Sequence, residues 1–175
     1  MRSRLALLLV VLLFAAGRGV QGEPAYADLS APNIKAAYLY NFSLYTEWPG
    51  PPVDGFHLCI IGRDPVASAI DALDGRLLRG KPLIVQHLDG GDQVGTCHVL
   101  YVGALTSGQR AALGRALGQL PVLTVGESRQ GDEFAPIVQL IPVGAHIAFE
   151  IDLGKARTAG LTLSSRLLGL ARAVH

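Results

Sequence analysis

Charged residues are scarce in this 175-residue chain, and neither sign dominates. Asp, Glu, Lys and Arg together make up 17% of it, with 15 basic and 14 acidic residues, for a formal net charge of +1. Proteins that bind nucleic acids usually carry clustered Lys and Arg, so this balance gives no support to nucleic-acid binding. Hydrophobic residues make up 50% of the chain, which excludes a disordered chain and allows a single domain with a buried core.

Recognisable catalytic and cofactor motifs are also missing. The sequence holds no G-x-S-x-G nucleophile elbow, no G-x-x-x-x-G-K-S/T phosphate loop and no H-E-x-x-H zinc motif. Residues 17–22 match G-x-G-x-x-G, but no predicted strand precedes them, so they do not form a dinucleotide-binding site. The five histidines are scattered without the paired spacing of a metal site. We therefore predict a protein that is not an enzyme and that uses no metal or cofactor.

One long apolar run is present, at residues 5–16, and two arginines precede it. Its length is that of a signal-peptide core and is short for a membrane span. Small residues allow cleavage after Gly22 or after Ala27, so we predict a signal peptide at residues 1–27 and a mature domain at residues 28–175. An uncleaved N-terminal anchor is the alternative. The signal peptide predicts export, in a bacterium to the periplasm.

The chain has only two cysteines, Cys59 and Cys97. An even number of cysteines in an exported protein favours a disulfide bond. Chain entropy would make such a bridge worth roughly 4 kcal/mol if it were unstrained. Two free buried thiols are one alternative, and a redox-active pair with an exposed thiol is another. Both cysteines lie beside apolar runs of strand length, which favours a structural bridge.

The hydrophobic pattern predicts strands that alternate with helices. Strand-like runs lie at 56–62, 81–88, 97–103 and 121–128, and helical patterns at 30–47, 63–75 and 106–118. Two more strands are predicted around a turn near residues 143–145, followed by short elements and a closing helix at 164–174. Strands that are apolar throughout are typical of a parallel sheet covered on both faces. The sequence therefore predicts a single α/β domain, Rossmann-like, with a mostly parallel mixed sheet, helices on both faces and a C-terminal hairpin.

Three predicted strands end in glycine immediately before a loop or helix. In open α/β sheets, ligands bind at the carboxyl ends of the strands, and helix N-termini at those ends attract anions. Arg63 and Arg129 lie close after two of these glycines, and Ser107 lies at the start of a predicted helix after the third. A small anionic ligand held by Arg63, Ser107 and Arg129 is therefore one hypothesis. The alternative is that the glycines form tight turns and that the arginines are solvated.

The first predicted helix leads into the only Trp of the chain, in the segment NFSLYTEWPG. Pro49 disfavours helical geometry at Trp48, so the helix is expected to stop by about Glu47. We expect Trp48 to pack with the helix against the sheet, as a continuation of its apolar side. The alternative is an aromatic partner-binding surface that includes Leu39, Tyr45 and Trp48, since Trp and Tyr are favoured in binding hot spots. The expected buried stripe of the helix comprises Ile34, Ala37, Tyr38, Phe42 and Tyr45.

Basic residues in two further places are interpreted as structural. Arg76, Arg79 and Lys81 form a short run that is typical of a solvated turn before a strand. Arg166 begins the closing helix, where the helix dipole disfavours a cation. Arg166 is therefore expected to have a carboxylate partner, with Glu47 and Glu150 as candidates.

Several segments in order resemble the YfiR-like family of exported bacterial proteins. The resemblance runs from about Asn33 to Val174, and its first and last segments are the most specific. In chain order the segments read IKAAYLYNFSLYTEWP, LCIIGRDP, LDGRLLRGKPLIV, CHVLYVG and IAFEIDLGKARTAGLTLSSRLLGLARAV.

This resemblance implies a periplasmic α/β domain that regulates and does not catalyse. The best-understood members bind the periplasmic sensing domain of an inner-membrane diguanylate cyclase and hold it inactive, which places them in c-di-GMP signalling. It also implies a homodimer and an outer-membrane lipoprotein that relieves the repression. Cys59 and Cys97 match the family's cysteines in LCIIG and CHVLYVG, which supports a bridge between them. Some members carry a second cysteine pair near the loop that reads GESRQGDEF here, and this chain has none there.

Overall fold

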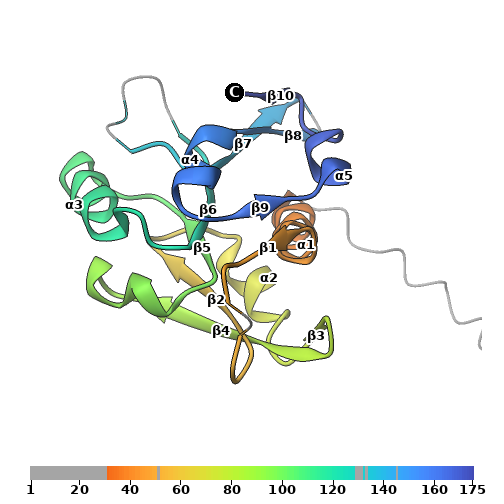
Figure 1. Cartoon of the computed structure of the whole chain (residues 1–175). Helices are drawn as coiled ribbons and strands as arrows, with labels where there is room; N and C mark the ends of the chain where they lie inside the picture. Colours follow the sequence, from red (N-terminus) through yellow and green to blue (C-terminus); the bar gives the residue numbers. More distant parts are fainter. Residues whose placement is uncertain (1–30, 51, 129–131, 133, 145) are drawn as a thin grey trace, which may run out of the picture.

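The computed structural model describes residues 31–175 except for residues 51, 129–131, 133 and 145. The predicted signal peptide and Arg129 lie outside the described residues. Within them, a central sheet carries helices on both of its faces (Figure 1). The predicted α/β domain with a mostly parallel mixed sheet is confirmed.

The central sheet has eight strands within the described residues, in the order β10-β8-β7-β6-β5-β2-β4-β3. From β4 to β7 the neighbouring strands are parallel, whereas β3 runs antiparallel to β4 and β8 antiparallel to β7. The β7–β8 pair is the predicted C-terminal hairpin. The strands are β2 (Phe56–Ile61), β3 (Leu77–Leu78), β4 (Lys81–Leu88), β5 (Val99–Val102), β6 (Leu123–Gly126), β7 (Val138–Val143), β8 (His146–Ile151) and β10 (Ala173–Val174).

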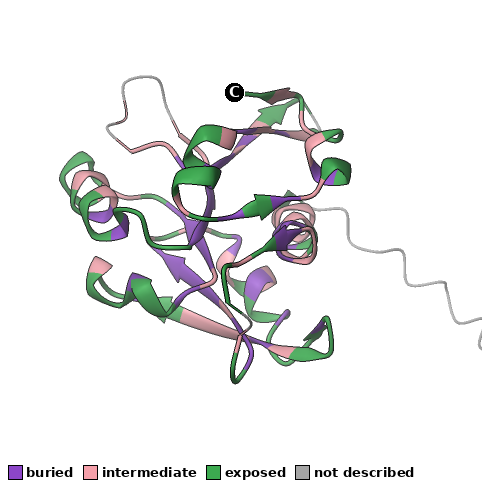
Figure 2. Ribbon diagram, in the orientation of Figure 1, coloured by how far each residue is buried: buried purple, intermediate pink, exposed green. Residues whose placement is uncertain are grey.

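Alternate side chains of the central strands point to opposite faces of the sheet, as the two-residue period of a strand requires. Leu58 and Ile60 of β2 join the core that contains α1 and α2, and Cys59 and Ile61 join the core that contains α3. The centre of the sheet is therefore buried on both sides (Figure 2). This double burial explains why β2 and β5 read as continuous apolar runs in the sequence.

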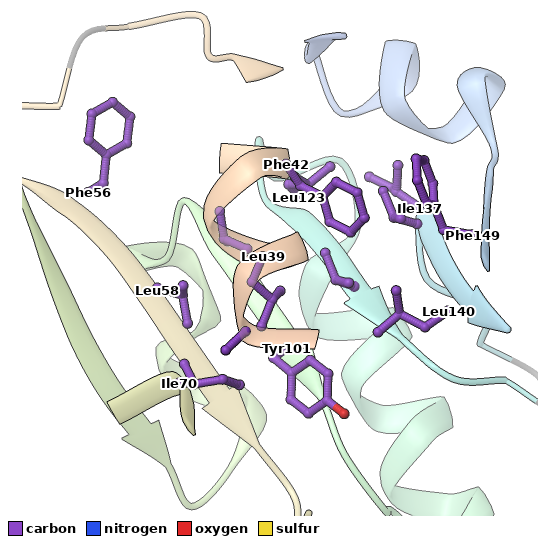
Figure 3. Close-up of a cluster of buried hydrophobic side chains, with 14 of the residues drawn as sticks. Leu39, Phe42, Phe56, Leu58, Ile70, Tyr101, Leu123, Ile137, Leu140 and Phe149 are labelled. Carbon is purple, nitrogen blue, oxygen red and sulfur yellow. The ribbon is translucent and has the colours of Figure 1, made fainter. Parts of the chain in front are cut away.

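The helices divide between the two faces. Residues of α1, α2, α4 and α5 pack in the larger core, and residues of α3 and of the 3-10 helix η1 pack in the smaller one. The helices are α1 (Ala31–Leu44), α2 (Ala67–Asp71), η1 (Gly91–Thr96), α3 (Ser107–Leu117), α4 (Leu153–Thr158) and α5 (Ser165–Leu168). Within the larger core, the ring of Phe42 lies 4.9 Å from that of Phe149, centroid to centroid, and joins α1 to β8 (Figure 3).

The predicted buried stripe of α1 is wrong in part. Ala37 is exposed, and the fully buried side of the helix consists of Ala36, Leu39, Phe42 and Ser43. Tyr38 and Tyr40 lie at the border of this side, because each hydroxyl reaches a backbone carbonyl while the ring packs against the core. The buried side of α1 is therefore rotated from the predicted stripe, and Phe42 is the one residue common to both.

Three short strands, β1, β3 and β10, were not predicted. After α1 the chain forms β1 (Thr46–Glu47), which pairs antiparallel with β9 (Thr162–Leu163), a short strand that the sequence did predict. The predicted closing helix is also too long, because α5 ends at Leu168 and β10 follows. The amides of Arg172 and His175 donate to carbonyl oxygens of β8, so the end of the chain satisfies the open edge of that strand.

Candidate functional site

The carboxyl ends of β2 and β5 form the point where the strand order reverses, which is the usual ligand position in such sheets. Here the two strand ends approach closely. Arg63 and Ala104 form a backbone bridge, and a Cβ atom on Gly62 would lie 2.7 Å from the carbonyl oxygen of Ala104. A Cβ atom on Gly126 would lie 2.6 Å from the carbonyl oxygen of Val102. The strand-end glycines therefore permit close backbone packing.

A small cavity of about 270 Å³ remains beside these strand ends. Its lining includes three carboxylates, those of Asp64, Glu127 and Asp132, and one guanidinium group, that of Arg110. An excess of carboxylates repels an anion. The cavity therefore does not favour the small anionic ligand of the sequence hypothesis.

The charged groups of this cavity already have partners. Lys35 of α1 pairs with Glu127 at 2.7 Å, and Arg110 lies 3.7 Å from Asp132. Asp64 accepts hydrogen bonds from the hydroxyl of Tyr101 at 2.9 Å and from the amide of Val66 at 2.8 Å. These contacts tie α1, α2, α3 and the ends of β5 and β6 together, which gives the cluster a structural role.

Tyr101 has an altered acidity as a result. Its side chain is buried, and burial followed by the charge of Asp64 raises the pKa of Tyr101 above its ordinary value of 10.0. The hydroxyl therefore stays protonated and remains a hydrogen-bond donor to Asp64.

The predicted anion ligands do not converge in the described structure. Arg63 is exposed and borders a cleft of about 680 Å³, whose lining does not include Ser107. Ser107 is the first residue of α3, and the helix is capped by Thr106, whose hydroxyl accepts from the amide of Gln109 at 3.3 Å. Arg129 lies outside the described residues. The anion site stays a prediction without geometric support.

Trp48 lies elsewhere, beyond the end of β1 and beside the start of β2. Its indole N–H donates to the carbonyl oxygen of His98 at 3.1 Å, and its ring meets Phe56 and His98 edge to face, with centroids 5.7 and 5.8 Å apart. Trp48 therefore packs against the sheet as expected, but on a different part of it from Tyr38 and Phe42. The side chain remains half-buried.

The predicted partner residues differ in their access to solvent. Leu39 is 0% exposed, so it belongs to the core and does not contribute to an outer surface. Tyr45 is half-buried, and the exposed Arg166 lies over it, with the guanidinium carbon 5.9 Å from the ring centroid and a nitrogen 3.4 Å from the hydroxyl. The expected carboxylate partner of Arg166 is wrong: among the described residues no ion pair joins Arg166 to Glu47 or Glu150, and Glu150 pairs with Arg172 and His175 instead.

A second arginine contacts a tyrosine of α1, whereas Tyr45 lies immediately after that helix. The guanidinium carbon of Arg76 lies 5.0 Å from the ring centroid of Tyr40, whose hydroxyl donates to the carbonyl oxygen of Leu77. Sequence reasoning missed both arginine–tyrosine contacts, because the partners are far apart in the chain. We call Tyr40, Tyr45, Trp48, Arg76 and Arg166 the aromatic–arginine surface; its aromatic residues come from α1 and the segment that follows it, and its arginines from later parts of the chain.

The two cysteines form a disulfide bond, with their Cα atoms 5.8 Å apart and a sequence separation of 38. Both are buried, at 0% and 5% exposure, in the smaller core. Cys59 lies in β2, and Cys97 immediately precedes His98 at the entry to β5. The bridge is therefore the structural one of the sequence prediction, and it fixes the segment on which Trp48 packs.

Residues 32–172 match the family described as YfiR/HmsC-like. The chain belongs to this family. The family is known for periplasmic regulators and is regulatory rather than catalytic, which supports a general regulatory role and interaction with a membrane signalling partner. Among the described residues, the helices are all too short or too polar to cross a bilayer.

Proposed function

We propose that the mature domain acts in the periplasm, where it binds the periplasmic part of an inner-membrane diguanylate cyclase and represses it. Membership of the YfiR/HmsC-like family over residues 32–172 carries this proposal. Repression follows if the domain binds the inactive conformation of the cyclase more tightly than the active one, because differential affinity shifts the equilibrium between them. The level of c-di-GMP would then rise when the domain is removed.

The aromatic–arginine surface is our proposed contact with the cyclase. Tyr, Trp and Arg are the residue types most enriched in binding hot spots. Arg76 and Arg166 are exposed and are held over tyrosine rings, so their guanidinium groups are ordered before a partner arrives. Neither arginine forms an ion pair with a described carboxylate, which leaves both available to acidic groups of the partner.

Two further partners belong to the same proposal. A homodimer would present two copies of the surface to a dimeric membrane sensor. An outer-membrane lipoprotein would relieve repression by competing for the domain. The small-anion alternative receives no support from the carboxylate-lined cavity beside the strand ends.

The test uses the native host with its chromosomal copy deleted and restored. Tagged wild-type domain is captured from host membranes and the bound proteins are identified by mass spectrometry, while c-di-GMP is measured in the same strains. We expect a diguanylate cyclase in the capture and raised c-di-GMP in the deletion strain. An unchanged c-di-GMP level together with a capture free of cyclases would refute the proposal.

Matched variants then locate the surface. The double variant R76E/R166E reverses two exposed charges of the aromatic–arginine surface, and R115E reverses an exposed charge on α3. We expect R76E/R166E to lose the cyclase and to raise c-di-GMP, and R115E to behave as wild type. Equal effects of both variants would place the contact elsewhere.

A further inference from the structure

Two histidines lie together at the amino-terminal ends of β2 and β5. The rings of His57 and His98 are stacked, with centroids 5.8 Å apart and an angle of 20° between their planes. The amide of His57 donates to Nδ1 of His98 at 3.0 Å, and the amide of His98 donates to the carbonyl oxygen of His57 at 2.9 Å. The side chain of His98 therefore replaces a backbone acceptor at this end of the sheet.

This hydrogen bond requires a particular protonation state of His98. An imidazole nitrogen accepts a hydrogen bond only when it carries no proton, so Nδ1 must be bare and the ring neutral. A protonated ring carries N–H groups on both nitrogens. Protonation of His98 would therefore turn the acceptor into a second donor that faces the amide of His57, and the bond would be lost.

Among the described residues, no acidic group lies beside the pair to compensate for a positive charge on His98. The titratable group that faces His98 from β2 is His57, whose own Nδ1 is buried with no hydrogen-bond partner in the described structure. The β1–β2 connection contributes the ring of Trp48, β2 also contributes Phe56, and β6 contributes the amide of Leu123. None of these last three groups carries a charge near neutral pH.

The electrostatics agree with this geometry. Burial, followed by the charge of His57, lowers the pKa of His98 below its ordinary value of 6.5. The neutral ring is thus the stable form in the folded protein near neutral pH, and the charged form becomes populated on acidification.

The backbone of His98 connects the pair to Trp48. Its carbonyl oxygen accepts from both the indole N–H of Trp48 at 3.1 Å and the amide of Leu123 at 2.9 Å. A ring that turns away from the amide of His57 would move the residue that holds Trp48 in place. Trp48 directly follows β1 and is itself part of the aromatic–arginine surface, so the change would alter that surface.

From these contacts we infer that the His57–His98 pair is a proton-operated latch, and that protonation of His98 releases Trp48 and loosens the segment at residues 45–49. The effect of this release on partner binding rests on the proposed function. The latch itself does not rest on the proposed function, because it can be measured in the isolated domain without a partner.

Trp48 is the only Trp in the chain, so its fluorescence reports the latch directly. The experiment records emission and acrylamide quenching of the purified mature domain from pH 8 to pH 4.5, with circular dichroism as a check on the fold. We expect a reversible red shift and at least a doubling of quenching, centred below pH 6.5, while the secondary structure persists. Fluorescence that stays constant over this range would overturn the latch.

Three variants separate the latch from other acid effects. In H98N the side-chain amide oxygen replaces Nδ1 as acceptor and cannot be protonated in this range, so the transition should disappear. In H57Q the charged neighbour is gone, so the transition should move to higher pH. In H87N the histidine removed is exposed on β4 and paired with Asp71 of α2, away from His98, so the wild-type curve should remain.

An H98N variant that keeps the wild-type transition would refute the proposal. If H98N does not fold, the direction of the shift in H57Q decides, and an unchanged or lower midpoint would refute it. Binding to the captured cyclase is then compared at pH 7.5 and pH 5.5, with a fall at pH 5.5 expected for wild type and none for H98N. If the domain binds the cyclase at neither pH, the result counts against the proposed function, and the fluorescence test of the latch is unaffected.

Discussion

The guanidinium group of Arg79 reaches the carbonyl oxygen of Leu44, the last residue of α1, and also that of Thr46. The last carbonyls of a helix have no partners within the helix, and a cation at that end is favoured by the helix dipole. Arg79 adopts a positive φ of 50° in the turn between β3 and β4. The turn therefore places a side-chain cap on a helix that lies 35 residues earlier.

Replacing Arg79 with Gln should weaken this cap. We expect R79Q to lower the free energy of unfolding by about 1 kcal/mol, because one charged donor to two carbonyls is lost at a partly exposed site. Urea unfolding followed by circular dichroism measures the change. The control is R115Q on α3, where an exposed arginine is removed without a cap, and equal losses in the two variants would show that Arg79 does not cap α1.

Removal of the disulfide should have a larger effect. We expect the double variant C59S/C97S to lose about 4 kcal/mol of unfolding free energy, since the bridge restricts the unfolded chain over a separation of 38 residues. The same urea titration gives the value, and dithiothreitol serves as the control. Reductant should destabilise the wild type and leave the double variant unchanged, whereas a double variant as stable as oxidised wild type would contradict the prediction.

The central strands could be predicted from the sequence because burial on both faces leaves runs that are apolar apart from single residues such as His57 and Thr124. Elements that depend on distant partners could not. The strand β1 forms because Thr46 and Glu47 pair with Leu163 and Thr162, more than a hundred residues later. The strand β10 forms because it pairs with the free edge of β8. Neither pairing leaves a periodic signal in a segment of two residues.

The candidate site likewise contains residues that the sequence revealed and residues that only distant contacts reveal. Tyr45 and Trp48 were found because aromatic residues are scarce and gather in one segment. Arg76 and Arg166 were assigned to a solvated turn and to a carboxylate, since nothing local reveals that one lies over Tyr40 of α1 and the other over Tyr45, just after it. The His57–His98 pair was missed because strand pairing, not spacing, brings the two rings together. A hydrophobic strand pattern gives register only after the neighbouring strand is known.

Close packing at the strand ends makes a prediction for Gly126. A Cβ atom there would lie 2.6 Å from the carbonyl oxygen of Val102 on β5, which is backbone and cannot move aside. We expect G126A to cost about 2 kcal/mol of unfolding free energy, the usual effect of overpacking. The control is G90A, at a glycine with open space around its Cβ position and an extended backbone. Similar urea midpoints for the two variants would contradict the prediction.

The contact between Tyr101 and Asp64 makes stability depend on pH in the alkaline range. At pH 7, Y101F removes a hydrogen bond to a carboxylate and should cost about 2 kcal/mol of unfolding free energy. Because the pKa of Tyr101 is raised in the folded state, the folded protein keeps a proton that the unfolded chain releases near pH 10.0. The stability that Tyr101 contributes is therefore present below pH 10 and is lost as pH rises further.

The measurement is the difference in unfolding free energy between wild type and Y101F, from urea titrations at pH 7 to pH 11. This difference cancels the ionisation of all groups common to both proteins, provided that they do not interact with Tyr101. We expect it to be constant up to about pH 9 and to shrink above pH 10. Y38F is the matched control, since the hydroxyl of Tyr38 donates to the carbonyl oxygen of Ile147 and has no carboxylate partner in the described structure. A wild-type minus Y101F difference that grows with pH would mean that Tyr101 ionises more readily in the folded protein, which is the reverse of what burial beside Asp64 requires.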